Sequence, residues 1–271
     1  MNGALTAKMT RDSAVVVLMT SVALVLFGFL FVLAMSNWAQ DLLLLWSKIG
    51  FIQRMFRFVL SIDLQGEVTV NTLIVSGFVH PFLLMITWGC IVSICTHFIV
   101  EPIDRGTADL LFTLPISRAT YFVSATAVWV SASGVIACAA LLGIWIGGEW
   151  FDLTPPLPIF RLILVVMNLW ILYFAIGCLA MCVAALVNRR TQAVGGMVAL
   201  LLSSFLINVL EAFIPFFRAI RFLGLLCYYR PVEILQSGNP SWTHIAVLTG
   251  IAVVSWVIGC GLFMRKDIPV A

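Results

Sequence analysis

The sequence predicts an all-α protein that crosses a membrane six times, and three features of the chain support this. Hydrophobic residues make up 62% of its 271 residues and charged residues only 10%, whereas a soluble domain carries about 25% charged residues. The apolar residues gather into long uncharged runs, each sufficient for a helix that spans a bilayer. The charges gather between these runs. We therefore expect a single transmembrane domain over residues 1–271.

The first span is expected over residues 14–35, because this uncharged run exceeds the roughly 7–15 apolar residues of a signal peptide. Residues 42–60 are also apolar but contain Lys48, Arg54 and Arg57. A charge near the centre of a membrane helix costs about 2.5–3.5 kcal/mol on insertion scales. We favour an amphipathic helix in the membrane interface for this segment. If it spans instead, the chain crosses seven times and its termini lie on opposite sides.

Five further spans are expected, over residues 71–100, 118–148, 159–187, 193–213 and 242–264. Gly77, His80-Pro81 and Gly89 are expected to kink the second span, which a membrane helix tolerates. Residues 188–192 form a short polar hinge between the fourth and fifth spans. Residues 214–242 mix aromatic residues with arginines, which predicts an interfacial or re-entrant hairpin.

The basic residues predict the orientation of the chain. With six spans, both termini lie on one side together with the connections 101–118 and 188–192. These segments hold eight of the 15 lysines and arginines, at about twice the density of the opposite side, and basic loops are typical of the cytoplasmic side. We expect a multi-pass protein of the cell membrane with both termini in the cytoplasm.

The connection between the second and third spans, Glu101 to Arg118, carries the clearest helix punctuation. Gly106 predicts a turn, and Thr107 is a suitable N-cap for a short helix. Pro115 ends that helix, because the residue before a proline avoids the helical region. Ser117 can then cap the third span. The pattern predicts a short helix across the end of the bundle, where it can dock on a partner.

These residues resemble a family. ABC-2 type permeases, the membrane subunits of a class of ABC transporters, carry a Glu, a Gly-Thr pair, a Leu-Leu pair and Pro-x-Ser-Arg in this order. Here the matching positions are Glu101, Gly106-Thr107, Leu110-Leu111 and Pro115-Ile116-Ser117-Arg118. Residues 176–193 are similar to the family's fourth helix, basic hinge and fifth helix, and residues 263–268 are similar to its C-terminal tail. Where the family often has Gly-Lys, this chain has Ser124-Ala125.

The resemblance implies a permease subunit of an ATP-driven transporter that exports a hydrophobic or amphipathic substrate. It implies three partners: an ABC ATPase subunit that binds ATP and Mg, a second permease copy or a paralogue, and membrane lipid. In the family the matching segment is the coupling helix that contacts the ATPase. The residues expected at this contact are Glu101, Asp104, Arg105, Gly106, Thr107, Leu110, Leu111, Pro115, Ser117 and Arg118, with Arg189 and Arg190 as a secondary cytoplasmic contact.

The chain itself is expected to hold no catalytic, cofactor or metal site. A phosphate-binding loop ends in Gly-Lys-Ser or Gly-Lys-Thr, and none of Lys8, Lys48 and Lys266 follows a glycine. Cys90, Cys95 and His97 are too few for a closed metal site, which needs about four converging ligands; the same holds for Cys178 and Cys182. The net charge of +3 gives no reason to expect a nucleic-acid partner.

Two other classes of function stay open from the sequence. Ser133, in Ser-Ala-Ser-Gly, together with His244 is similar to a rhomboid-like intramembrane serine protease, but the two residues differ by roughly 15 Å in predicted depth, beyond hydrogen-bond reach. A non-transporting membrane scaffold could recruit partners through residues 42–60. On spacing alone, Glu101 and Arg105 form a solvated i, i+4 pair.

Overall fold

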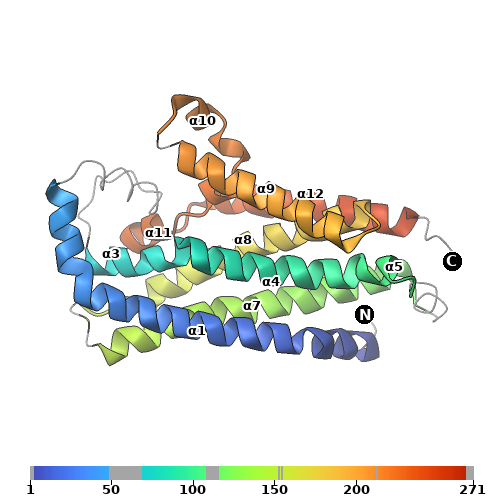
Figure 1. Cartoon of the computed structure of the whole chain (residues 1–271), viewed down its shortest axis with the longest axis horizontal. Coiled ribbons are helices and arrows are strands. Elements are labelled where there is room, and N and C mark those ends of the chain that lie inside the picture. Colours follow the sequence, from blue (N-terminus) through green and yellow to red (C-terminus); the bar gives the residue numbers. More distant parts are fainter. Residues whose placement is uncertain are drawn as a thin grey trace.

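Figure 1 shows the computed structural model of the protein as an elongated bundle of helices. The structure describes residues 3–48, 69–107, 116–151, 153, 155–211 and 213–266. Every regular element in these ranges is helical. In chain order the elements are α1 (Gly3–Lys48), α3 (Val70–Val75), η1 (Ser76–Val79), α4 (Pro81–Ile99), α5 (Glu101–Asp104), α7 (Arg118–Trp150), α8 (Ile159–Leu186), α9 (Arg190–Leu210), α10 (Pro215–Ala219), η2 (Arg221–Leu223), η3 (Leu225–Tyr228), α11 (Pro231–Ser237) and α12 (Trp242–Arg265).

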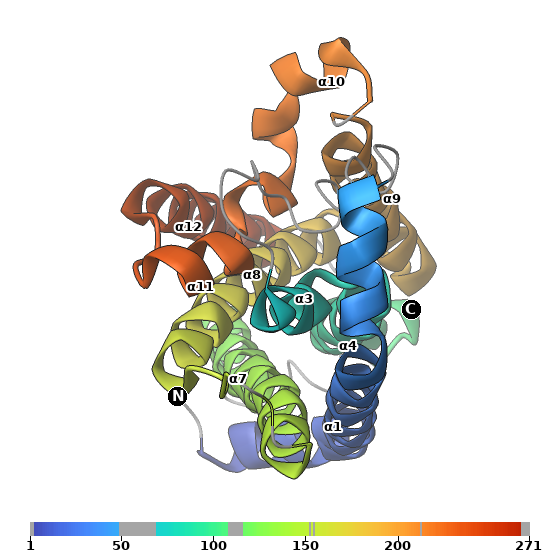
Figure 2. The same cartoon turned by 90° about the vertical axis from the view of Figure 1, so that its left-hand side faces the viewer.

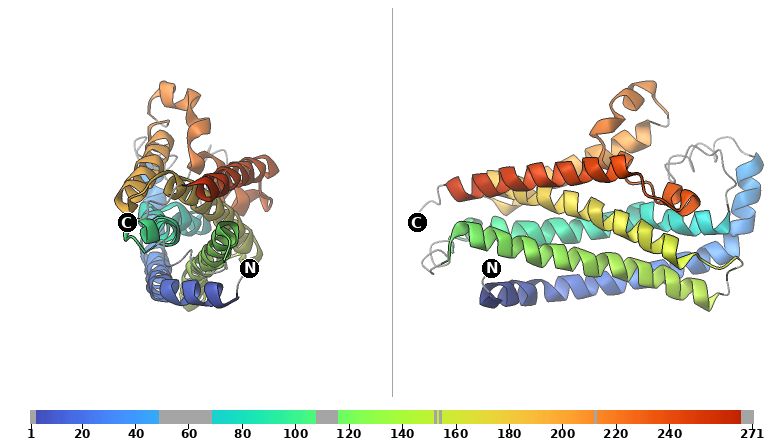
Figure 3. Two further views of the ribbon diagram at one scale, coloured as in Figure 1. Left: turned by 90° about the vertical axis from the view of Figure 1, so that its right-hand side faces the viewer. Right: turned by 180° about the vertical axis from the view of Figure 1, so that it is seen from behind.

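Six stretches of the described chain are long and apolar enough to cross a membrane, which agrees with the sequence prediction. They are Gly3–Leu42, Val70–Ile99, Arg118–Trp150, Ile159–Leu186, Arg190–Leu210 and Trp242–Arg265. The last five begin and end within a few residues of the predicted spans. Both ends of the chain lie at the same end of the bundle (Figures 1 and 3). We call this the terminal end, and the opposite one the distal end.

The first helix is longer than predicted, since α1 begins at Gly3 and continues to Lys48, beyond residues 14–35 on both sides. Towards its C-terminal end α1 bends and runs across the distal end of the bundle (Figures 1 and 2). Ser36 and Asn37 both donate side-chain hydrogen bonds to the carbonyl of Leu33, and such bonds compete with the helix ladder and favour bending. Residues 49–60 lie outside the described residues, so the interfacial helix at 42–60 stays a prediction.

The long helices pack through close approaches of their backbones. α8 packs against α4, α7, α11 and α12, and α1 packs mainly against α7. At the α1–α7 contact, a Cβ at Gly143 would lie 2.5 Å from the carbonyl oxygen of Val25. A Cβ at Gly28 would lie 2.8 Å from the backbone nitrogen of Ile144. These two glycines allow the close contact between membrane helices that small residues typically make.

The second span is broken at two of the three predicted positions, Gly77 and His80-Pro81, whereas Gly89 lies inside the continuous helix α4 and the kink predicted there is wrong. The 3₁₀ turn η1 separates α3 from α4, and His80 between them has extended backbone angles, as expected before Pro81. The His80 Nδ1 accepts a hydrogen bond from the backbone N–H of Phe82. Its ring packs against Phe27 and Phe31 of α1, with centroids 5.4 and 5.7 Å apart. His80 therefore caps α4 at the break, and the packing of its ring on α1 stabilises this arrangement.

The connection between α9 and α12 divides into two parts at the distal half of the bundle. α10 and η2 project sideways from the other helices (Figure 2), and Phe216 and Phe222 are 65% and 60% exposed. η3 and α11 pack instead on the long helices, where the backbone N–H of Leu225 donates to Ser204 Oγ of α9. The exposed aromatic rings fit the interfacial or re-entrant hairpin predicted at residues 214–242, which stays a prediction.

Candidate functional site

The second span ends in a sharply defined turn that carries the first residues of the predicted coupling segment. α4 is followed by Val100 and then by the single-turn helix α5. Gly106 has a φ of +66°, which glycine adopts without strain. The backbone N–H groups of Gly106 and Thr107 donate to the carbonyls of Ile103 and Pro102, at 3.1 and 2.9 Å. This is a Schellman motif, so the turn predicted at Gly106 is confirmed.

The structure describes both ends of the predicted coupling segment. Residues 108–115, with Leu110, Leu111 and Pro115, lie outside the described residues, so the short helix and the N-cap role of Thr107 stay predictions. At the far end, Ser117 Oγ accepts a hydrogen bond from the backbone N–H of Thr120 at 3.1 Å. The predicted cap of the third span is therefore confirmed.

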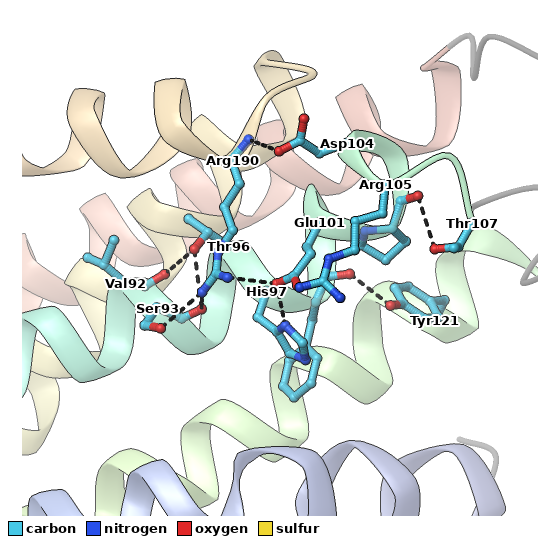
Figure 4. Close-up of polar contacts among 12 residues, drawn as sticks. Val92, Ser93, Thr96, His97, Glu101, Asp104, Arg105, Thr107, Tyr121 and Arg190 are labelled. Carbon is cyan, nitrogen blue, oxygen red and sulfur yellow. Dashed lines mark hydrogen bonds and ion pairs between the residues drawn. The ribbon is translucent and has the colours of Figure 1, made fainter. Parts of the chain in front are cut away.

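Glu101 is a buried acid at the junction of α4 and α5 (Figure 4). The residue is only 6% exposed, and its carboxylate contacts three basic side chains. His97 lies one turn earlier and Arg105 one turn later, both within 2.5 Å. Arg190, from the start of α9, approaches to 2.8 Å. The solvated pair expected from the spacing of Glu101 and Arg105 is thus wrong for Glu101, although the Arg105 side chain is 71% exposed.

The partners of Glu101 favour its charged form. Burial raises the pKa of the Glu101 carboxyl group, whereas the hydrogen bond and charge of His97 and the charges of both arginines lower it. The lowering effects outweigh burial, and the pKa lies below its ordinary value. Glu101 is therefore an anion at neutral pH, and it holds two guanidinium groups and the His97 ring at one point.

Arg190 connects this anion to the fifth span. Its backbone N–H donates to Asp104 Oδ2 of α5 at 3.0 Å, and its guanidinium donates to Ser93 Oγ of α4 at 3.1 Å. Arg189, the N-cap residue of α9, makes no side-chain capping bond. A carboxylate at a helix N-terminus is favourable because it meets free N–H groups and the positive end of the helix dipole. Asp104 thus caps α9 from another element.

These contacts join three elements at the terminal end, and we call Ser93, His97, Glu101, Asp104, Arg105 and Arg190 the Glu101 cluster. The cluster ties α4, α5 and α9 together. Glu101, Asp104, Arg105 and Arg190 were predicted as contact residues. The structure places the Arg190 side chain against Glu101, and it leaves Arg189 exposed on the surface.

A second set of contacts holds the other helix ends at this face. The Tyr121 hydroxyl of α7 donates to the carbonyl of Phe98 at 2.7 Å. Lys266, which follows α12, donates to the carbonyl of Val187, the residue before the predicted hinge, and burial lowers the pKa of its ammonium group. Arg118 donates to the Lys266 carbonyl at 2.6 Å. α5 therefore contacts the hinge at Arg190, and the end of α12 contacts the residue that precedes the hinge.

A groove runs from the Glu101 cluster along the bundle between α4 and α9. Its volume is about 910 Å³, near the upper end of the roughly 300–1,000 Å³ typical of small-molecule sites. Leu84, Val92, Val198 and Leu202 are among its apolar lining residues, and charged residues of the Glu101 cluster close its terminal end. The groove combines a long apolar wall with one polar end.

Sequence reasoning missed the roles of His97 and Ser93. His97 had been considered only as a metal ligand with Cys90 and Cys95, but it pairs with Glu101, and the i, i+4 spacing of the two residues is a signal that could have indicated this. In the described part of the chain, no group of three or more His, Cys, Asp or Glu residues could hold a metal ion. Ser93 carries no such signal, because its partner Arg190 is remote in sequence.

The serine considered for a protease lies in a packed contact. Ser133 is 1% exposed; its hydroxyl donates to the carbonyl of Val130 and accepts from the Trp170 indole. His244 lies in the first turn of α12 at the distal end, beside the Tyr228 ring. No protein-family model matches the chain, and no curated protein matches it. Function is therefore inferred from the residues and their geometry.

Proposed function

We propose that the chain is the membrane-spanning permease subunit of an ABC transporter of the ABC-2 type, and that it exports a hydrophobic or amphipathic substrate. Three findings support this: six helices of membrane-spanning length, the ordered motif from Glu101 to Arg118, and the Glu101 cluster. ATP and Mg bind to a separate ATPase subunit, consistent with the lack of a lysine that follows a glycine. The permease pairs with a second copy or a paralogue.

In this proposal the terminal end faces the cytoplasm and the protein lies in the cell membrane. The basic residues of the terminal-end segments support this orientation, because basic loops are retained on the cytoplasmic side. The ATPase then docks on the connection between α5 and α7, and Arg189 provides a second contact. The exposed aromatic residues of α10 and η2 face the outer leaflet.

The observation that carries the proposal is the link from Glu101 and Asp104 to Arg190. An ATPase that closes on ATP displaces the connection 101–118. Because α5 holds the first residue of α9 through a backbone bond and an ion pair, that displacement moves α9 relative to α4. The groove lies between these two helices, so its shape changes with the nucleotide state of the partner. Two copies enclose a path for the substrate.

The test is capture of the ATPase by the purified chain. Gly106→Pro removes the N–H that ends α5 and is incompatible with a φ of +66°. Gly238→Pro is the matched control, since Gly238 has a φ of +73° and also donates its N–H, but it ends α11 at the distal end. We expect wild type and Gly238→Pro to copurify with a P-loop ATPase. Gly106→Pro should capture at least ten-fold less of the ATPase than wild type.

Two results would contradict the proposal. One is a wild-type complex that transports without any P-loop ATPase, which would fit a membrane scaffold or a different transporter class. The other is equal capture by both proline variants, which would place the contact elsewhere. Folding of each variant is checked by its elution as a single species in detergent, so that loss of capture is not confused with loss of the protein.

A further inference from the structure

Two glycines face the groove from opposite walls, Gly89 on α4 and Gly195 on α9. A Cβ at either position would have no atom of the described chain within 4 Å, unlike Gly28 and Gly143, where another backbone fills that space. Both residues are exposed and line the groove. The described chain therefore supplies nothing that packs on them, and the space in front of them is open to an occupant from outside the chain.

The charges at the terminal end of the groove have both signs. The Arg105 guanidinium pairs with Glu101, but its side chain is 71% exposed. Asp104 also lies on the surface, where its Oδ2 accepts from the backbone N–H of Arg190. The mouth therefore offers a guanidinium and a carboxylate on adjacent residues. A headgroup with a phosphate and an ammonium matches this pair, because the phosphate accepts from arginine and the ammonium meets the acid.

The groove is longer than one lipid. It extends from Pro81 to the Glu101 cluster, which at 1.5 Å per helical residue is roughly 30 Å, the thickness of the whole hydrocarbon core. One phospholipid occupies about half of that thickness, so it fits between the Glu101 cluster and Gly89, near the middle of α4. A lipid with its headgroup at Arg105 would place its ester carbonyls and acyl chains along this wall, on the side of the terminal-end leaflet.

We propose that the α4–α9 groove binds one zwitterionic phospholipid, with its headgroup at Asp104 and Arg105 and its acyl chains against Gly89 and Gly195. This inference rests on the proposed function, whose substrate class it names: a phospholipid taken from the leaflet at the terminal end. A helix of a second copy is the competing occupant, and the open glycines alone would suit it equally. The charged mouth at one end of a long apolar wall favours an amphiphile.

The test is native mass spectrometry of the full-length chain with dioleoylphosphatidylethanolamine added to the detergent. A Cβ at Gly89 or Gly195 meets no described atom within 4 Å, so Gly89→Leu and Gly195→Leu each project a side chain into the groove, and each is expected to lower lipid occupancy at least ten-fold. Gly250→Leu is the matched control, because Gly250 is equally open on α12, away from the groove. Two variants on different helices keep the test valid if one of them fails to fold.

The headgroup is tested with the same lipid. Arg105→Gln is expected to weaken binding several-fold. Arg265→Gln, an exposed arginine at the terminal end of α12 that does not line the groove, should leave binding unchanged. Dioleoylphosphatidylglycerol, which lacks the ammonium, should bind more weakly than the ethanolamine lipid to the wild-type chain. Equal binding of both lipids would overturn the assignment of a zwitterionic headgroup.

Other outcomes would overturn the lipid site itself. If all three leucine variants lower occupancy equally, the lipid is a general bilayer contact. If Gly89→Leu and Gly195→Leu shift the chain from dimer to monomer and leave lipid occupancy unchanged, the groove is a protein interface. Because the assay needs no ATPase, failure of lipid binding leaves ATPase capture as a separate result. A chain that binds lipid but captures no ATPase would instead contradict the permease assignment.

Discussion

Glu101→Gln removes one negative charge and leaves the shape of the side chain almost unchanged. In the wild-type protein the carboxylate faces His97, Arg105 and Arg190. The pair with Arg105 contributes little, because that side chain is 71% exposed and exposed ion pairs are worth about 0–1 kcal/mol. The pair with Arg190 matters more, since the Arg190 side chain is only 33% exposed and loses its counter-charge.

The expected loss of stability follows from that burial. Removal of one partner from a fully buried ion pair costs about 3–5 kcal/mol. A third of the Arg190 side chain stays in contact with solvent and Ser93 still accepts from it, so we expect a loss of about 2 kcal/mol. For a chain of this size the loss corresponds to a melting temperature lowered by roughly 5 °C.

The assay is thermal unfolding of the purified chain in detergent, with Glu233→Gln as the matched control. Glu233 is also paired with an arginine, Arg230 at 3.6 Å, but its side chain is 51% exposed. We expect this control to change stability by less than about 1 kcal/mol. If the two glutamine variants melt at the same temperature, Glu101 does not hold the terminal end together, and the transmission from α5 to α9 inferred above is wrong.

The difference in stability between wild type and Glu101→Gln depends on pH. The pKa of Glu101 is lower in the folded chain than its ordinary value of 4.5, so its stabilisation is fully present above that value and is lost as the pH falls through the folded pKa. The difference in melting temperature between wild type and Glu101→Gln should be constant from neutral pH to about pH 5 and should shrink below it. A difference that grows on acidification would contradict the assignment.

Three further predictions concern caps, packing and orientation. Ser117→Ala should cost about 1 kcal/mol, whereas Ser241→Ala should be nearly neutral, because Ser117 caps α7 and Ser241 makes no capping bond to α12; unfolding curves of both variants test this. Gly143→Leu should separate α1 from α7 and abolish folding, whereas Gly250→Leu should be tolerated, as monitored by elution in detergent. Reporter fusions at both termini that are active only in the cytoplasm should both be active, and activity at one terminus alone would indicate seven spans.

The spans could be predicted because bilayer thickness and the cost of buried charge leave few alternatives. The predicted start of the first helix is wrong, because hydropathy detects apolar runs and not helix that continues into polar sequence. The first turns of α1 contain Lys8, Arg11 and Asp12, which hydropathy excludes from a span. Yet alanine, lysine and methionine favour helix in water as well, so the helix starts at Gly3 before the apolar run begins.

The site divides in the same way into local and tertiary parts. The turn at Gly106 and the cap at Ser117 are local, because their bonding partners lie a few residues away. The burial of Glu101 and its contact with Arg190 depend on how α4 and α9 pack, and no spacing in the sequence encodes that. The groove is likewise a property of two helix faces that meet only in the folded bundle.

The way α9 begins has one more consequence. This helix has no cap among its own residues, and the carboxylate that completes its first turn belongs to α5. When α5 withdraws, the N–H of Arg190 loses its acceptor and the first turn of α9 should fray. Amide exchange at residues 190–193 would then report, residue by residue, whether α5 and α9 are in contact, without any knowledge of a ligand.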